Sequence, residues 1–176
     1  MVLLARLLTL ALTAAATPIL RRDAITVERD LNTKIAPPVS TLGNDVEALP
    51  ECGLSGALAI PVDLQALIPT MDAVTADINN PGSLDEESGA TISITAQNVI
   101  GSLVGTLADL QNKASSWPDM LGKQVLISNL ESLNTAFDNL ANALITSETP
   151  AHKDQVTALK NQIDSGFWTV IAVYSA

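Results

Sequence analysis

Sulfur and aromatic side chains are scarce in this chain, and their scarcity excludes several kinds of protein. The 176 residues contain one cysteine and one histidine, and only 3% are aromatic. Because Cys52 is the single cysteine, no disulfide can form within the chain. So few aromatic residues cannot build the Tyr- and Trp-rich surfaces of sugar-binding modules or the stacking platforms of single-strand nucleic-acid binders. Aliphatic side chains must therefore supply the packing.

Groups suited to catalysis are also few. Cys52 has no histidine near it in sequence, His152 stands alone, and no Gly-x-Ser-x-Gly motif occurs. The carboxylates of residues 85–87 are better explained as the solvated first turn of a helix, where the helix dipole favours negative charge, than as an acid–base pair. The sequence therefore predicts a protein that is not an enzyme, with no catalytic residue, no metal site and no cofactor. We interpret His152 as a solvated polar residue.

Positive charge is scarce as well. The chain has 9 Lys and Arg residues against 19 Asp and Glu residues, a net charge of −10. Phosphate recognition needs clustered Lys and Arg, and an acidic surface repels nucleic acid and anionic lipid head groups. We therefore expect no nucleic-acid partner.

The N-terminal segment has the features of a secretory leader. Arg6 lies beside a short apolar run, and small residues lead to a cleavage position at Ala16. The run is too short to cross a bilayer, which takes about 20 apolar residues, so we expect no transmembrane anchor. Residues 21–23 read Arg-Arg-Asp, a dibasic stretch that predicts processing after Arg22, although the two arginines could also be a solvated helix start. The expected organisation is a signal peptide at 1–16, a short propeptide at 17–22 and a single helical-bundle domain at 23–176.

The apolar residues that are present recur with helical spacing. Along one segment they alternate at intervals of four and three, which places them on a single stripe of an α-helix. The members of this stripe are Leu126, Leu130, Leu133, Phe137, Leu140 and Leu144. Such a stripe is stable in water only when it is buried against another apolar surface.

Four further segments repeat this pattern. We expect a first helix interrupted at Pro37–Pro38, because two consecutive prolines remove two amide donors. A second helix is predicted to follow Pro61, a third to open at Ser83, a fourth to start at Pro118 and a last one to follow Pro150. The fold class is therefore all-α, an antiparallel bundle of about five helices whose first helix is kinked or split.

Two details of these helices suggest how they pack. Gly101 and Gly105 lie one turn apart, which indicates either close helix approach or room for a bound chain, and we favour close approach. Trp117, just before the predicted fourth helix, is expected to pack on a following apolar residue, with the mouth of a pocket as the alternative.

If the bundle encloses a lipid cavity, its lining is expected near the middles of three helices. An ordinary packed core explains the same stripes and remains the alternative for each residue. The candidate lipid-binding residues are Leu67, Met71, Val74, Val99, Leu103, Leu107, Leu130, Leu133, Phe137 and Leu140.

Several features together resemble the hydrophobic surface-binding protein A family, the fungal cell-wall galactomannoproteins. They are the leader, the dibasic Arg21–Arg22–Asp23, and a domain of Ala-, Leu-, Ser- and Thr-rich helices that includes the turn at Gly53 and the segments 103–113 and 133–137. The resemblance implies a small helical bundle that adsorbs to waxy or polymeric surfaces, or that encloses fatty acids between its helices. Some relatives recruit hydrolases to such surfaces.

Two hypotheses for function follow. The first is a secreted, non-enzymatic protein whose partner is a long-chain fatty acid or another hydrophobic ligand or surface, bound in an apolar inter-helix groove or on an exposed apolar face. The second is a structural or effector-like cell-wall protein with a dry core, whose apolar face engages a secreted hydrolase, a wall polymer or a host protein. In both cases we expect an extracellular protein, free or loosely associated with the cell wall.

Overall fold

The computed structural model describes residues 25–79, 86–118 and 121–176, and these residues form helices without any strand. The predicted signal peptide, the propeptide and the processing positions Ala16 and Arg22 lie outside the described residues, as do Ser83 and Asp85 at the predicted start of the third helix.

Five long helices make up the described part of the chain. The first is helical from residue 25 and contains a π-helical turn, η1 (Leu31–Ile35), that continues into α2 (Ala36–Glu47). The others are α3 (Gly53–Asn79), α4 (Glu86–Asn112), α5 (Gln124–Ser147) and α6 (Pro150–Ser175), with a short 3₁₀ turn, η2 (Ala114–Ser116), between α4 and α5. The predicted all-α bundle of about five helices is confirmed.

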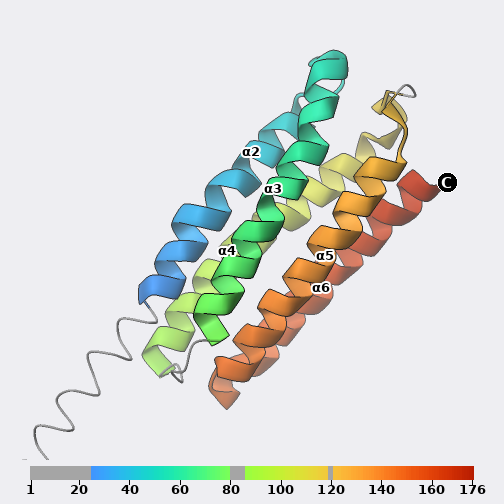
Figure 1. The fold of residues 1–176 in the computed structure, drawn as a ribbon. Coiled ribbons are helices and arrows are strands. Elements are labelled where there is room, and N and C mark those ends of the chain that lie inside the picture. The colour runs from blue at the N-terminus through green and yellow to red at the C-terminus, as the bar shows by residue number, and fades with distance from the viewer. Residues whose placement is uncertain (1–24, 80–85, 119–120) are drawn as a thin grey trace, which may run out of the picture.

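The helices are arranged as a closed ring. Consecutive helices run in opposite directions (Figure 1). The principal contacts join α2 to α3, α3 to α5, α5 to α6, α6 to α4, and α4 back to α2. None of the described helices occupies the middle of this ring, so side chains from its members must fill the centre. Those side chains form one continuous core of Leu, Ile, Val, Ala and a few larger residues.

The predicted interruption of the first helix is confirmed as a junction of two helical pieces. The amide of Ala36 donates to the carbonyl of Leu31, five residues back, which is the hydrogen bond of a π turn. Pro37 and Pro38 follow within the first turn of α2, where an α-helix has no internal partner for the amide that proline lacks. The π turn places Leu31 and Ile35 in the core.

Two predicted helix starts are wrong. The second helix begins at Gly53, whose positive φ of 62° turns the chain, and not after Pro61. Both Pro61 and Pro69 lie inside α3, and the Asn129 side chain of α5 donates to the Pro61 carbonyl at 2.8 Å. The fourth helix begins at Gln124 and not at Pro118, because Gly122, with a positive φ of 61°, turns the chain just before Gln124.

Trp117 packs on an aromatic residue far along the chain. Its ring meets that of Tyr174 edge to face, with centroids 5.6 Å apart. The Tyr174 hydroxyl donates to the Leu110 carbonyl at 3.0 Å, and burial raises the pKa of Tyr174 to about 12. The two rings therefore fasten the end of α6 to the end of α4.

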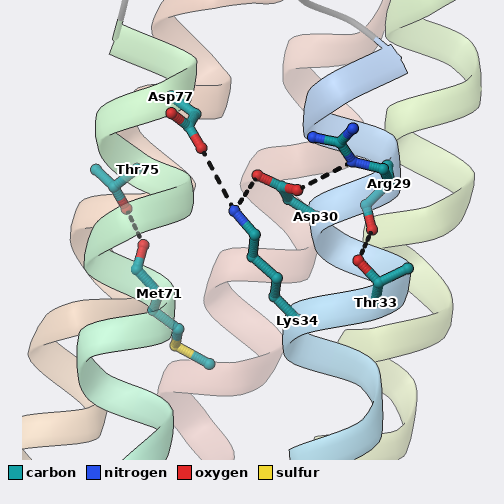
Figure 2. A network of polar contacts seen from close by, with 7 residues as sticks. All are labelled: Arg29, Asp30, Thr33, Lys34, Met71, Thr75 and Asp77. Atoms are coloured by element: carbon teal, nitrogen blue, oxygen red, sulfur yellow. Dashed lines mark hydrogen bonds and ion pairs between the residues drawn. The ribbon is translucent and has the colours of Figure 1, made fainter.

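A polar network joins the first helix to α3 near the opposite end of the ring (Figure 2). The Lys34 ammonium lies 2.6 Å from the buried carboxylate of Asp30 and 3.9 Å from that of Asp77. Burial opposes the ionisation of Asp30, but the hydrogen bonds with Lys34 and Asp77 and the charges of Lys34 and Arg29 outweigh it and hold the pKa of Asp30 below its ordinary value. The network therefore links the first helix to α3 through the contact between Lys34 and Asp77.

A second polar contact joins α2 to α3 and involves two acids. Burial, a side-chain hydrogen bond with Asp45 and repulsion from its charge raise the pKa of Asp63 to about 6. Asp63 therefore keeps its proton to a higher pH in the folded protein than in the unfolded chain.

The glycines predicted to mark close helix approach do not do so. A Cβ added at Gly101 or Gly105 would meet no atom within 4 Å, and both residues are exposed on α4. The close approach to α4 comes instead from Gly43 of α2, where a Cβ would lie 3.1 Å from the Thr106 hydroxyl.

Replacing each exposed glycine of α4 by alanine is therefore expected to stabilise the protein. Gly101→Ala and Gly105→Ala should each raise the free energy of unfolding by about 1 kcal/mol, because alanine loses less backbone entropy in a helix. Gly43→Ala is the matched contrast and should show no such gain, since its methyl group crowds Thr106. Urea denaturation measures all three, and destabilisation by Gly101→Ala or Gly105→Ala would show that another element covers that face of α4.

The acid pair predicts a pH dependence of stability. Because the pKa of Asp63 is raised in the folded protein, its favourable contribution to the free energy of unfolding is present at low pH. This contribution is lost as the pH rises from about 4 to about 6. Asp63→Asn keeps a donor for Asp45 and should raise the free energy of unfolding by about 1 kcal/mol at pH 7.5, with little change at pH 4. Asp72→Asn, at an exposed position of the same helix, is the control. Equal effects of the two substitutions at pH 7.5 would rule out the pair as the cause.

Candidate functional site

A small void lies inside one half of the ring. Its volume is about 20 Å³, and it is bounded by the π turn, α4, α5 and α6. Its walls are hydrocarbon except for one lysine. The lining residues are Leu31, Ile35, Ala96, Val99, Ile100, Phe137, Leu140, Ala141, Leu144, Val156 and Lys160.

Two alanines account for the position of this void. Ala96 on α4 and Ala141 on α5 are buried at positions that face longer aliphatic and aromatic side chains. A methyl group fills less of the ring centre than the Leu, Ile and Val residues that occupy most other core positions. Space therefore remains where the two alanines meet the branched side chains of the π turn and α6.

The void is too small to hold a fatty chain as it stands. A single water needs about 10–15 Å³ of such space, and an engineered cavity of about 150 Å³ is of the size that admits benzene. A bound acyl chain would have to push the surrounding helices apart.

All ten residues predicted to line a lipid cavity are buried in the common core. Val99, Phe137 and Leu140 line the void. The other seven lie in the core without lining it: Leu67, Met71, Val74, Leu103, Leu107, Leu130 and Leu133. Their contact with a lipid remains a prediction.

The predicted lining missed eight of the eleven lining residues, and two omissions account for six of them. The predicted lining omitted the first and last helices, which supply Leu31, Ile35, Val156 and Lys160. It also omitted alanine, although Ala96 lies three residues before Val99 and Ala141 four residues after Phe137. A periodicity search that counts alanine as a core residue would have found both.

The one charged residue beside the void is already paired. Lys160 donates to Asp138 of α5 and, at 2.8 Å, to Asp164 of its own helix. Hydrogen bonds to these two carboxylates raise the pKa of Lys160 above its ordinary value. The three groups together carry one net negative charge, so Lys160 is a poor anchor for the carboxylate of a ligand.

A buried polar cluster lies beyond the void at the end where α4 and α6 begin. Its residues are Ser93 of α4, Glu148 and Thr149 between α5 and α6, and His152 of α6. Burial raises the pKa of Glu148, against the lowering effects of His152, the Thr149 amide and Ser93. The prediction that His152 is solvated is wrong, since the residue is half-buried and its Nε2 atom is shielded from solvent.

Serine, histidine and glutamate are the residue types of a hydrolase triad, but this cluster lacks the hydrogen bonds of one. Within the described part of the chain, the Ser93 hydroxyl and both Glu148 carboxylate oxygens have no hydrogen-bond partner of good geometry. A triad needs its base bonded to both of the other groups. Among the described residues, no group of three His, Cys, Asp or Glu side chains is placed to hold a metal ion.

An apolar surface lies outside the ring as well. Leu54, Leu58 and Val62 follow one another at intervals of four along α3, and 44%, 50% and 64% of their surfaces are exposed. Beside them, a groove of about 220 Å³ is bounded by Trp117 and the exposed Val125 of α5. Trp117 therefore lies at the rim of a pocket, the alternative that the sequence left open.

Comparison with known proteins identifies a matching family and solved structures of similar fold. A family model described as hydrophobic surface binding protein A matches residues 24–146. The fold is similar to that of AFMP4P in complex with palmitic acid, with a TM-score of 0.78 and 26% identity over 86% of this chain and 99% of that chain. No curated protein sequence gives a significant match.

Two more distant structures share the fold. Ligand-binding domain 1 of the Penicillium marneffei MP1 protein, complexed with arachidonic acids, has a TM-score of 0.79 and 15% identity over 87% of this chain and 99% of that chain. Ligand-binding domain 2 of the same protein, complexed with multiple arachidonic acids, has a TM-score of 0.78 and 16% identity over 86% and 96% of the two chains.

Proposed function

Because the chain belongs to the hydrophobic surface binding protein A family, we propose that it is a secreted, non-enzymatic protein that binds a long-chain fatty acid between its helices. The observation that carries this proposal is the hydrocarbon-lined void at Ala96 and Ala141. It marks the point where the ring centre is least filled, and therefore where an acyl chain can enter with the smallest displacement of side chains.

The similarity to AFMP4P supports the same ligand class. That structure contains palmitic acid, it is 26% identical to this chain, and nearly all of it is covered by the match. A single acyl chain is also compatible with the geometry here, because α4 alone is 27 residues long, or about 40 Å at 1.5 Å per residue.

The energetics allow useful affinity. Burying roughly 14 methylenes gives about 11 kcal/mol at about 0.8 kcal/mol each. Lost ligand freedom and the separation of the helices subtract several kcal/mol, which leaves an affinity near the micromolar range. Because most of this energy comes from hydrocarbon, chain length should determine affinity more strongly than the head group.

The expected processing fits an extracellular carrier. Cleavage after Ala16 and Arg22 removes three arginines, leaving 6 basic and 19 acidic residues and a net charge of −13. A strongly acidic surface keeps such a protein soluble and away from anionic lipid surfaces. An apolar ligand would then be carried in the bundle and not at a membrane.

The outer face of α3 favours a second candidate function. Leu54, Leu58 and Val62 offer apolar surface without a partner in the described structure, and together with Val125 they could adsorb to a hydrophobic surface or contact a secreted hydrolase. This function needs no internal ligand, so the two are separable by experiment.

Palmitic acid is expected to stabilise the delipidated protein. At a ligand concentration roughly 100 times Kd, the gain is about 2.7 kcal/mol, which should raise the Tm by several degrees in differential scanning calorimetry. Ala96→Leu fills the void and should abolish most of this rise. Ala108→Leu, at an exposed position of the same helix, should retain it.

The outcome separates the two functions. Loss of the palmitic acid effect in Ala96→Leu alone supports an internal site. If palmitic acid leaves the Tm of the parent protein unchanged, the internal site is excluded and the outer face of α3 remains as the hydrophobic surface.

A further inference from the structure

The void and the buried polar cluster are adjacent along three helices. On α4, Ser93 precedes the void-lining Ala96 by three residues; between α5 and α6, Glu148 follows the void-lining Leu144 by four. On α6, His152 precedes the void-lining Val156 by four. Each polar residue therefore lies one helical turn beyond an apolar wall residue, toward the same end of the bundle. An apolar chain in the void would end at the polar cluster.

Several polar atoms of this cluster are buried with weak hydrogen bonds or none. Among the described residues, the Ser93 hydroxyl, both carboxylate oxygens of Glu148, the Thr149 hydroxyl and Nε2 of His152 are buried without a hydrogen bond of good geometry, although Ser93 and the Thr149 amide approach the Glu148 carboxylate closely enough to lower its pKa. Ser93 is 1% exposed and Glu148 is 4% exposed. Burying such groups without partners is unfavourable, so a cluster of five atoms indicates a place where a polar group from outside the chain completes the hydrogen bonding.

Gly89 provides the space for this arrangement. A Cβ at residue 89 would overlap the Glu148 carboxylate and lie 3.3 Å from a carbon of the His152 ring. The glycine therefore lets the carboxylate lie directly against α4, one turn before Ser93. The cluster is thus held between α4 and the α5–α6 corner.

The charges of the cluster define which head group fits. Glu148 is the acid of the site, and His152 is the other described titratable group beside it. A ligand carboxylate would bring a second acid next to Glu148, and one of the two would have to take up a proton. Lys160 offers no compensation, because Asp138 and Asp164 already engage it. A hydroxyl, in contrast, can donate to Glu148 and accept from Ser93 without any change in charge.

We propose that Ser93, Glu148 and His152 form the head-group site for an acyl chain bound at the void, and that they favour a single-chain lipid with an uncharged hydroxyl head over the corresponding carboxylate. This inference rests on the proposed function, since it needs an acyl chain in the void. The ligand class is that of fatty alcohols and monoacylglycerols, with fatty acids bound more weakly when they are ionised.

The test compares 1-hexadecanol with palmitate at pH 7.5, by displacement of Nile red from the full-length mature protein. The parent protein should bind 1-hexadecanol roughly tenfold more tightly than palmitate, the ratio that corresponds to a penalty of about one pKa unit. Glu148→Gln keeps the size of the side chain and removes its charge, so the preference should fall to near unity, mainly through tighter binding of palmitate.

Two further variants make the result specific. Glu131→Gln removes the same charge from an exposed position of α5 and should leave the preference intact. Ser93→Ala should weaken the binding of 1-hexadecanol more than the binding of palmitate. If both ligands bind but the ratio of their affinities is the same in the parent protein, Glu148→Gln and Glu131→Gln, the proposed head-group site is wrong. If neither ligand binds the parent protein, the proposed function itself fails.

Discussion

A ring of five helices has to fill its own centre. In the part of the chain that the structure describes, no helix runs through the middle, so the packing of the bundle depends on how far the inward side chains of α2 to α6 reach. Leu, Ile, Val and Phe reach far enough over most of the length. The shorter side chains of Ala96 and Ala141 do not reach far enough, and a hydrocarbon-lined void remains beside them. The proposed site for an acyl chain lies at this shortage of side-chain volume.

The ends of the ring differ in what holds them. At one end, Trp117 and Tyr174 join α4 to α6, and the Lys113 ammonium donates to the Glu47 carbonyl at 2.6 Å, beside the C-terminus of α2. At the other end, Lys34 links Asp30 to Asp77, and a separate group around Glu148 places buried polar atoms next to the void. The apolar interior thus has an aromatic contact at one end and a polar cluster at the other. This arrangement matches the proposed ligand, which is an apolar chain with one polar end.

Much of the fold was predictable from the sequence, because burial of hydrocarbon in a helix leaves a periodic signature. The stripe from Leu126 to Leu144 is α5, and every one of its six residues is buried. The starts of α3 and α5 were not predictable from proline alone. Pro61 lies inside α3, and Asn129 of another helix donates to its carbonyl, a contact that exists only in the assembled bundle. The site was predictable only in part, since equally apolar stripes do not reveal which helices are neighbours, and Ser93 and Glu148 meet only after α4 and α5 are placed in the ring.

The central claim is that a fatty chain enters the ring and does not rest on its outside. Stearic acid carrying a nitroxide spin label on its chain tests this most directly, through paramagnetic broadening of methyl signals in NMR spectra of the protein. An internal site predicts that the methyl groups of Ile100 and Leu140, which line the void, broaden strongly while those of Leu58 and Val62 on the outer face of α3 remain sharp. Broadening confined to Leu58 and Val62 would contradict the account.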